Sequence, residues 1–372
     1  MARITKEFDP DPQAIGARLL RHLQSEHACP SLAFRAPPAM MSLGLETWVY
    51  AFELEGAPEA LSGPAVLRVF PADARDRQAT FEATVQNHLA SVGLAVPRVP
   101  FACEDPAPIG HPFLLMERAP GQMQLIAALA GKNVLRRVPE LMAEALVGMP
   151  RQLADAQHCL HAVDAAPLRA RLEEVGLPST MYTIDGWHDD VQTRIANSGA
   201  SDFEPLLEWL ANHRPPEPET PVICHGDFTP PNVLTAEGQI TGLIDWSGAT
   251  LAEPAWDVAN TGMPLALNPF DVPRLLAPIT GAVRSRAARA YLDAYCDASP
   301  SDAPLDRERL AWYEVLVAAR SLARTVEDRC NDFHGRDGRR ANPWLARRAT
   351  RPLIRHLREL TGLAIPIGLA EE

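Results

Sequence analysis

Two short motifs in the second half of the chain constrain its fold and chemistry more than any other feature. Residues 224–232 read CHGDFTPPN, and IDW follows at 244–246. Transfer of a phosphoryl group needs a carboxylate that orients and deprotonates the attacking hydroxyl, and oxygen ligands for the Mg²⁺ on the nucleotide phosphates. Asp227, Asn232 and Asp245 supply these groups. The two motifs together therefore predict a phosphoryl-transfer site.

The spacing of these residues indicates how the chain brings them together. Asn232 follows Asp227 by five residues, which matches the Asp-to-Asn interval of kinase catalytic loops. Apolar pairs on either side of a turn at 237–238 predict a hairpin that joins Asn232 to Asp245. Mg²⁺ favours sparse oxygen ligation that phosphate oxygens and water complete. We therefore expect Asp227 to be the catalytic base and the other two residues to be metal ligands.

At these residues the sequence resembles the aminoglycoside phosphotransferase and choline-kinase-like family, whose signature is HGD, four residues, Asn, then IDW or IDF. The run EPAWDVA at 253–259 resembles the segment that follows this signature in the family. The resemblance implies that Asp257 is a structural residue that supports the catalytic loop. It also implies ATP, or GTP, and Mg²⁺ as cofactors. A simple turn with an exposed carboxylate would explain either motif alone, but not the ordered set.

The resemblance implies an α/β (α+β) fold with two lobes, like that of protein kinases. The N-terminal nucleotide-binding lobe would span 1–118, with a first helix at about 12–27 and then an antiparallel sheet and a helix. The larger C-terminal lobe, 119–372, would be mainly helical, with the catalytic loop at 225–232 and the metal-binding segment at 244–246. Helical patterns occur in this lobe at about 138–163, 203–213, 285–296, 306–330 and 343–360.

The chain lacks the lysine that kinase-like enzymes place on the third N-lobe strand to hold the nucleotide phosphates. Its two lysines, Lys6 and Lys132, lie outside any candidate strand of that lobe. The expected strand at 65–70 carries one charge, Arg68. A guanidinium can hold phosphate through two hydrogen bonds, so we expect Arg68 to replace the lysine. The alternative is a surface arginine at the end of a strand.

The partner of Arg68 can be predicted from helical periodicity. Between residues 76 and 92, apolar residues recur at helical spacing and form a core-facing stripe, with Glu82 at its edge. A partly buried glutamate requires a cation or hydrogen bonds. We therefore expect an ion pair between Glu82 and Arg68, as in kinase-like folds. The alternative is that Glu82 is a solvated residue at the margin of the stripe.

Further nucleotide contacts are expected at two places in the first lobe. Gly44 lies where a turn that covers the phosphates would fall, although a single glycine is a weak signal. The apolar strand that ends near Met116 would lead into the hinge between the lobes. By resemblance, backbone groups from Glu117 to Ala119 would bind the adenine edge, with Met116 against the ring. The alternative is a plain strand terminus.

The phosphate acceptor is the least constrained part of the prediction. Carboxylates in the region where an acceptor pocket is expected would suit a polycation; they are Asp189, Asp190, Glu327 and Asp328. The alternative is that these residues are solvated helix charges. His161 also matches a recurrent position of the family, but a lone histidine at a helix end is most often structural. We therefore leave it out of the catalytic set.

Composition argues against several other classes of protein. A chain of 372 residues with 47% apolar and 22% charged residues is an ordinary globular protein with room for two lobes. The net charge of −12 argues against a nucleic-acid partner. No apolar run reaches membrane-spanning length, the N-terminus lacks a signal-peptide core, and the six cysteines are scattered. We expect a cytoplasmic monomer or homodimer without disulfides, structural metal, nucleic acid or membrane contact.

We expect the chain to transfer phosphate to a hydroxyl of a small molecule, such as an aminoglycoside or another antibiotic. A metabolic kinase of the choline or sugar type fits the same residues. Only seven residues separate Asp245 from Glu253, too few for the peptide-docking activation segment of a protein kinase. A catalytically weak nucleotide-binding member of the fold is a further alternative, which Arg68 and the single Gly44 would suit. The retained base and metal ligands argue against it.

Overall fold

The computed structural model describes residues 11–43, 47–71, 74–124, 142–267, 277–299, 305–330 and 347–365. Of these residues, those up to Pro120 form one compact unit and those from Gly121 form a second. We call them the N-terminal unit and the C-terminal unit. Gly44, the expected residue of the phosphate-covering turn, lies outside the described residues.

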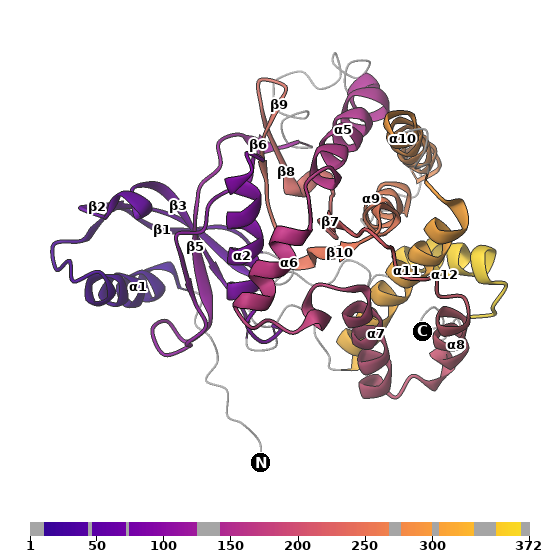
Figure 1. Ribbon diagram of the computed structural model, residues 1–372, viewed down its shortest axis with the longest axis horizontal. Coiled ribbons are helices and arrows are strands. Elements are labelled where there is room, and N and C mark those ends of the chain that lie inside the picture. The colour runs from indigo at the N-terminus through magenta and orange to yellow at the C-terminus, as the bar shows by residue number, and fades with distance from the viewer. Residues whose placement is uncertain are drawn as a thin grey trace. The chain divides into compact units, whose positions relative to one another are not determined.

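The N-terminal unit is a five-stranded antiparallel sheet with two helices (Figure 1). The strand order is β1-β2-β3-β5-β4. Its elements are α1 (Pro12–Glu26), β1 (Ala33–Leu43), β2 (Trp48–Glu55), η1 (Glu59–Leu61), β3 (Gly63–Val69), α2 (Gln78–Ser91), β4 (Phe101–Cys103) and β5 (Phe113–Glu117). The two helices expected at about 12–27 and 76–92 are confirmed as α1 and α2.

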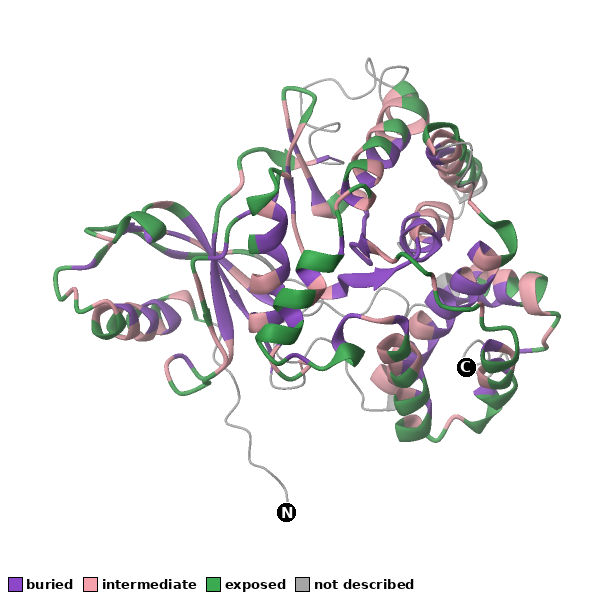
Figure 2. Cartoon of the chain, viewed as in Figure 1, coloured by how far each residue is buried: buried purple, intermediate pink, exposed green. Residues whose placement is uncertain are grey.

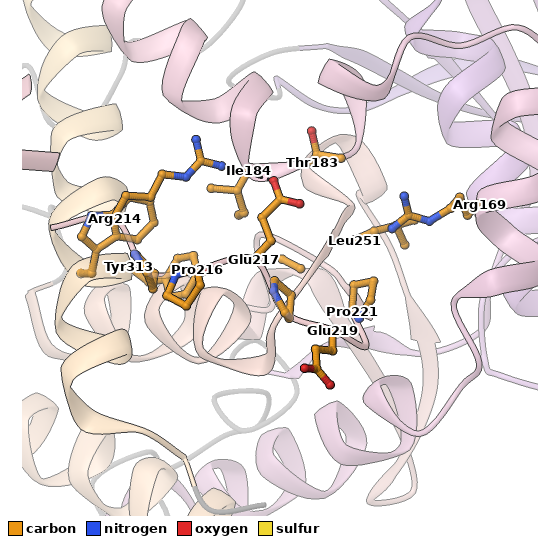
Figure 3. A pocket seen from close by; sticks show the side chains of 14 residues that line it. Arg169, Thr183, Ile184, Arg214, Pro216, Glu217, Glu219, Pro221, Leu251 and Tyr313 are labelled. Atoms are coloured by element: carbon orange, nitrogen blue, oxygen red, sulfur yellow. Dashed lines mark ion pairs between the residues drawn. The ribbon is translucent and has the colours of Figure 1, made fainter. Parts of the chain in front are cut away.

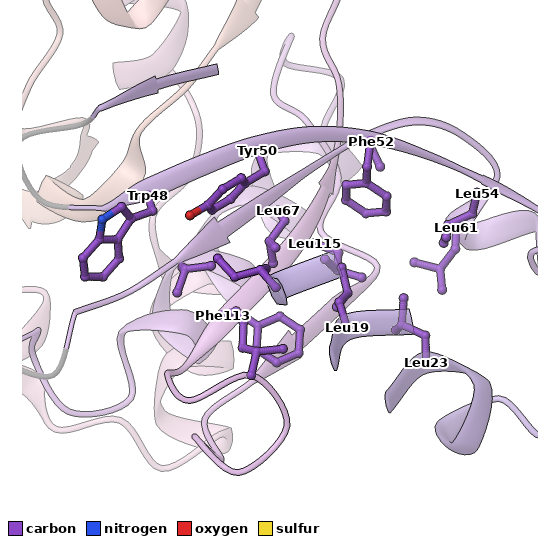
Figure 4. Close-up of a cluster of buried hydrophobic side chains, with 14 of the residues drawn as sticks. Leu19, Leu23, Trp48, Tyr50, Phe52, Leu54, Leu61, Leu67, Phe113 and Leu115 are labelled. Carbon is purple, nitrogen blue, oxygen red and sulfur yellow. The ribbon is translucent and has the colours of Figure 1, made fainter. Parts of the chain in front are cut away.

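The two faces of this sheet pack against different helices. Successive residues of a strand point to opposite faces. Leu67 of β3 belongs to a buried cluster that includes Leu19 of α1 (Figure 4), whereas Val66 belongs to a second cluster with Ala79 of α2. Burying an aliphatic side chain of this kind stabilises the fold by about 1.5–3 kcal/mol. Arg68 lies two residues after Val66, so it points to the face that α2 covers.

The C-terminal unit contains two small antiparallel sheets that carry the loop 225–232, which is the expected catalytic loop. One has the order β6-β8-β9 and the other pairs β10 with β7. The strands are β6 (Gln122–Met123), β7 (Val222–Cys224), β8 (Val233–Ala236), β9 (Gln239–Leu243) and β10 (Thr250–Ala252). Two short 3₁₀ turns, η6 (Pro230–Asn232) and η7 (Trp246–Gly248), lie next to them.

Helices make up most of the C-terminal unit. They are η3 (Glu144–Gly148), α5 (Met149–His161), α6 (Ala166–Glu174), η4 (Ser179–Met181), α7 (Ile184–Ser198), η5 (Ser201–Phe203), α8 (Glu204–Asn212), α9 (Pro254–Leu267), α10 (Ala277–Ala298), α11 (Arg307–Cys330) and α12 (Arg347–Thr361). Buried residues predominate on β3, β5 and α9 (Figure 2). Within the described parts of the chain, no helix is both long and apolar enough to cross a membrane.

Candidate active site

A buried carboxylate anchors the loop that carries Asp227. Asp257, in the first turn of α9, accepts hydrogen bonds from the backbone N–H groups of His225 (3.0 Å) and Gly226 (2.7 Å). Burial alone would raise the pKa of Asp257, but the hydrogen bond and charge interaction with His161, together with those with His225, outweigh it and lower the pKa. Asp257 therefore stays ionised and supports the loop, as the resemblance implied.

The His225 ring joins the loop to the end of the β8–β9 hairpin. Its Nδ1 accepts the N–H of Asp227 at 3.3 Å, and its Nε2 lies 3.1 Å from the carbonyl oxygen of Ile244. Because a carbonyl can only accept, the proton must be on Nε2. Burial lowers the pKa of His225, which favours this neutral form. The sequence prediction gave His225 no role of its own.

Gly226 allows two backbone segments to approach closely at the start of the loop. Its φ is +75°, a conformation that favours glycine. A Cβ atom at this position would lie 2.0 Å from the carbonyl oxygen of Gly248. Any other residue at 226 would therefore push the loop away from η7, which follows Asp245 directly.

The structure brings Asp227 and Asn232 into direct contact. Asn232 Nδ2 donates to the Asp227 carboxylate at 2.8 Å and to the Asp227 backbone carbonyl at 3.0 Å. A carboxylate only accepts hydrogen bonds, so the amide nitrogen faces Asp227 and Oδ1 is the atom of Asn232 that suits Mg²⁺. Thr229 Oγ1 lies 3.3 Å from the other carboxylate oxygen. Thr229 was missed from the sequence, although a threonine two residues after a loop aspartate is a local hydrogen-bonding signal.

The β8–β9 hairpin has the form that the sequence predicted, and it places Asp245 near Asn232. The N–H of Ile244 donates to the Asn232 carbonyl at 3.0 Å. Asp245 itself has φ +66° and ψ +73°, in the left-handed region that costs most residues about 1 kcal/mol or more. Ser247 Oγ donates to the Asp245 carboxylate at 2.9 Å. Strain of this kind is typical of side chains whose direction matters for function.

The predicted ion pair of the N-terminal unit is present. Arg68 and Glu82 are 4% and 0% exposed, which excludes both the surface arginine and the solvated glutamate, and Arg68 Nε lies 3.5 Å from Glu82 Oε2. Gln78 Nε2 donates to Glu82 Oε1 at 2.9 Å, and Gln78 Oε1 accepts a hydrogen bond from Arg75 Nε at 3.0 Å. Gln78 was not predicted, because its position on α2 gives no signal for this contact. Binding of phosphate by Arg68 stays a prediction.

Hydrogen bonds of the sheet already engage some of the backbone groups that were expected to bind adenine at the hinge. The N–H of Glu117 donates to the Arg98 carbonyl at 2.9 Å, and the N–H of the next residue donates to the Pro64 carbonyl at 3.0 Å. These two N–H groups are used within the N-terminal unit. Of the three residues expected to bind the adenine edge, Ala119 is therefore the one whose N–H remains a candidate donor. Met116, which was expected against the ring, is buried in the sheet.

His161, Cys224 and Asp257 lie close enough together to resemble a metal site, since their ligand atoms are within 4.8 Å of one another. Burial raises the pKa of the Cys224 thiol well above its usual value, so it stays protonated and donates to the Glu253 carbonyl at 3.6 Å. His161 lies between Asp257 (3.1 Å) and the Tyr295 hydroxyl (2.7 Å). This cluster is therefore a hydrogen-bonded support for the loop 225–232.

A separate pocket is lined in part by the proline-rich segment 214–221 (Figure 3). It is lined by that segment, by β10 and by α11 at Tyr313. Its charged side chains have both signs, since Arg169 and Arg214 line it together with Glu217. None of the predicted catalytic or metal-binding residues lines this pocket, and we assign it no catalytic role.

Comparisons with known proteins identify a family and several relatives of the chain. The model of the phosphotransferase enzyme family, APH, matches residues 41–313. An aminoglycoside 3'-phosphotransferase of Streptomyces fradiae is 28% identical over 193 residues, which are 51% of this chain and 65% of that protein. The acyl-CoA dehydrogenase family member 10 of Mus musculus is 31% identical over 186 residues, 48% of this chain. The chain matches only 16% of the length of that relative.

Solved structures show the same fold. The aminoglycoside phosphotransferase APH(4)-Ia, in a ternary complex with ADP and hygromycin B, superposes with a TM-score of 0.54 at 19% sequence identity. The match covers 91% of this chain and 98% of that chain. The kinase-like fold class expected from the sequence is thereby confirmed.

Proposed function

Because the chain belongs to the phosphotransferase enzyme family, we propose that it transfers the γ-phosphate of ATP to a hydroxyl group of a small molecule. The observation that carries this proposal is the hydrogen-bonded pair of Asp227 and Asn232, next to Asp245, on a loop that the buried Asp257 holds. ATP is the first nucleotide to test and GTP the second. We place the reaction in the cytoplasm, where both nucleotides are available.

The residues of the loop fit the chemistry of this reaction. Asp227 would accept a hydrogen bond from the acceptor hydroxyl and take its proton as the new P–O bond forms. The bond from the γ-phosphorus to the bridging oxygen would break, and ADP would leave with that oxygen. Asn232 Oδ1 and the Asp245 carboxylate would hold Mg²⁺, which neutralises charge on the phosphates. Arg68, set by Glu82, would bind phosphate oxygens.

The short segment after Asp245 favours a small molecule over a peptide as the phosphate acceptor. It consists of η7 and β10, and β10 pairs with β7, so the chain returns to the core of its unit before Glu253. This stretch provides no long loop on which a peptide substrate could dock. An aminoglycoside or another antibiotic is one acceptor class that the named relatives suggest. A metabolic alcohol of the choline or sugar type is the other.

A test is the release of ADP from Mg-ATP in the presence of a panel of hydroxylated small molecules. We expect at least one acceptor to raise the rate, EDTA to remove the increase, and mass spectrometry to show a phosphorylated acceptor. The matched control is the Asp202→Asn variant, which removes an exposed carboxylate of the same unit and should behave as wild type. ADP release that no acceptor stimulates, and that persists in EDTA, would contradict the proposal.

A further inference from the structure

Glu253 directly precedes α9 and joins two parts of the C-terminal unit through its backbone. Its carbonyl oxygen accepts the N–H of Trp256, in the first turn of α9, at 3.1 Å and the thiol of Cys224, at the end of β7, at 3.6 Å. Trp256 is followed by Asp257, and Cys224 is followed by the loop 225–232. Glu253 therefore lies where the helix that carries Asp257 meets the strand that leads into this loop.

The side chain of Glu253 is held by the first two turns of α11. Arg309 Nη1 donates to Glu253 Oε2 at 2.8 Å, and the Tyr313 hydroxyl donates to Glu253 Oε1 at 2.8 Å. Glu253 is 7% exposed, and a buried carboxylate needs a counter-charge and hydrogen bonds to offset its lost hydration. Burial and the Glu253 charge raise the pKa of Tyr313 above its usual value, so its hydroxyl stays a donor. Both carboxylate oxygens of Glu253 are therefore engaged by α11.

Arg309 also binds a second segment that leads to the loop 225–232. Its Nη2 donates to the backbone carbonyl of Pro216 at 2.8 Å. Pro216 belongs to the proline-rich segment 214–221, which continues directly into β7, and it lines the same pocket as Tyr313 (Figure 3). Two nitrogens of one guanidinium thus hold two different segments. The flat fork of an arginine allows this arrangement, and a lysine ammonium reproduces it less well.

The beginning of α11 is itself firmly packed, so it can serve as a fixed base for these contacts. Leu310, Trp312 and Leu316, which lie on either side of Tyr313 in the chain, are all buried. Trp312 Nε1 donates to the carbonyl of Leu210, in α8, at 3.0 Å. Close-packed interiors transmit displacement rather than absorb it. The position of α11 is therefore passed on to the residues that Arg309 and Tyr313 hold.

The contacts of Glu253 lead to both supports of the loop 225–232. One support is the end of β7, which the Cys224 thiol joins to the Glu253 carbonyl. The other is Asp257, which lies four residues after Glu253 and accepts two backbone N–H groups of the loop. A displacement of Glu253 would therefore reach the loop from two directions. A shift of a reacting group by about 1 Å can lower a reaction rate about a hundredfold.

We propose that Arg309 is a positioning residue for the phosphate transfer, because it fixes Glu253 and, through it, the loop 225–232 that carries Asp227. The inference rests on the proposed function. Arg309 would not touch the reacting atoms, and its effect would pass through Glu253 to Asp257 and then to the loop. If Arg309 only stabilised the unit as a whole, its loss would loosen all parts of the unit alike and would leave the rate of the folded protein unchanged.

Hydrogen exchange measured by mass spectrometry tests this inference without turnover. The N–H groups of His225 and Gly226 bond to Asp257, so they exchange with solvent only when these bonds open. We expect Arg309→Ala to raise the exchange rate of a peptide spanning 222–228 about tenfold, and that of α6 in the same unit by less than about twofold. An unchanged rate in 222–228, or an equal rise in α6, would overturn the inference.

Three further variants control this measurement. Arg307→Ala removes an exposed arginine two residues earlier on the same helix, and its exchange rates should equal those of the wild type. Arg309→Lys keeps the charge beside Glu253, so it should raise the rate in 222–228 only about threefold. Tyr313→Phe removes one hydrogen bond to Glu253 and keeps the ion pair, with a similar rise expected. Should Arg309→Ala fail to fold, these two milder variants decide; wild-type exchange in both would show the inference to be wrong.

Turnover links the exchange result to the reaction. With the acceptor identified for the wild type, and well below the unfolding temperature, Arg309→Ala should lower kcat about tenfold and leave KM for ATP within about twofold. Arg309→Lys should recover part of the loss. An unchanged kcat would contradict the inference alone. If the wild type itself shows no Mg²⁺-dependent ADP release with any acceptor, the proposed function fails, and hydrogen exchange still decides whether Arg309 holds the loop.

Discussion

The two units hold their functional charges in different ways. In the N-terminal unit, Arg68 and Glu82 are both almost fully buried and compensate each other through side chains. In the C-terminal unit, Asp227 is only partly buried. Its loop is held by hydrogen bonds that backbone N–H groups of the loop donate to the carboxylate of Asp257.

This difference follows from what each charge has to do. Arg68 keeps its charge throughout, so it can be buried with a counter-charge. In the proposed reaction Asp227 would gain and lose a proton, and it accepts hydrogen bonds from the neutral amide of Asn232 and the hydroxyl of Thr229. A strong salt bridge to this carboxylate would hold its pKa too low for a base. The fold therefore fixes the position of Asp227 through the backbone instead.

The largest effect is expected where the backbone support is removed. The asparagine of the Asp257→Asn variant has one acceptor oxygen for three N–H donors, and its NH₂ group, itself a donor, would face some of them. We expect stability to fall by about 3 kcal/mol and phosphate transfer to fall about a hundredfold, equal to about 2.7 kcal/mol of barrier. Urea unfolding and ADP release measure the two effects. A variant with wild-type stability and rate would show that Asp257 does not hold the loop.

Loss of a metal ligand should have a more selective effect. Asp245→Ala removes a carboxylate that we assign to Mg²⁺ but leaves Arg68, the proposed phosphate-binding residue of the other unit, in place. We expect ATP to bind about tenfold more weakly in Mg²⁺, a change of about 1.4 kcal/mol. In EDTA, wild type and variant should bind ATP equally. Calorimetric titration under both conditions measures this, and an unchanged Mg²⁺-dependent affinity would count against the assignment.

Substitutions in the N-terminal unit that keep its charges should have smaller effects on activity. Arg68→Lys retains the cation but loses the guanidinium fork. Gln78→Ala retains both charges and removes one hydrogen bond to Glu82, at about 1 kcal/mol. We expect each to raise KM for ATP about threefold, or about 0.7 kcal/mol, with the acceptor KM unchanged. Steady-state kinetics with each substrate varied would show the split, and an unchanged KM for ATP in both variants would exclude a phosphate role for Arg68.

The smallest effect concerns pH and stability. The pKa of His225 is lowered by burial, and so is that of His188. Below about pH 6.5 the unfolded chain binds protons that the folded chain does not, so stability falls as pH drops. Each group contributes a slope of at most about 1.4 kcal/mol per pH unit. The lowered pKa of Asp257 adds a further loss below about pH 4. Unfolding midpoints in urea from pH 7.5 to 5.5 test the first window; stability that rises on acidification would contradict it.

The parts of the site that depend on local sequence patterns were predicted, whereas the parts that depend on long-range contacts were mostly not. The hairpin between Asn232 and Asp245 follows from apolar pairs around one turn, and the direction of Arg68 follows from strand alternation. The contact of Asp257 with His161 joins residues 96 positions apart, so no local pattern shows it. The resemblance alone suggested that Asp257 was structural.

Helices without a clear amphipathic stripe were also missed. Helix α9 is buried around most of its circumference, so its apolar residues show no 3.6-residue period that distinguishes one face. Helix α7 was likewise not predicted as a helix, although Asp189 and Asp190 were noted. The pairing of Glu327 with Arg194 depends on the packing of α7 against α11, which the sequence does not show.

The role of Asp227 as the base is the central claim, and one variant tests it most directly. Asp227→Asn keeps the size of the side chain and removes its capacity to accept a proton. Phosphate transfer to the acceptor identified for the wild type should fall by at least about 10²–10⁴-fold, while calorimetry shows nucleotide binding close to that of the wild type. An Asp227→Asn protein that transfers phosphate at the wild-type rate would contradict the account.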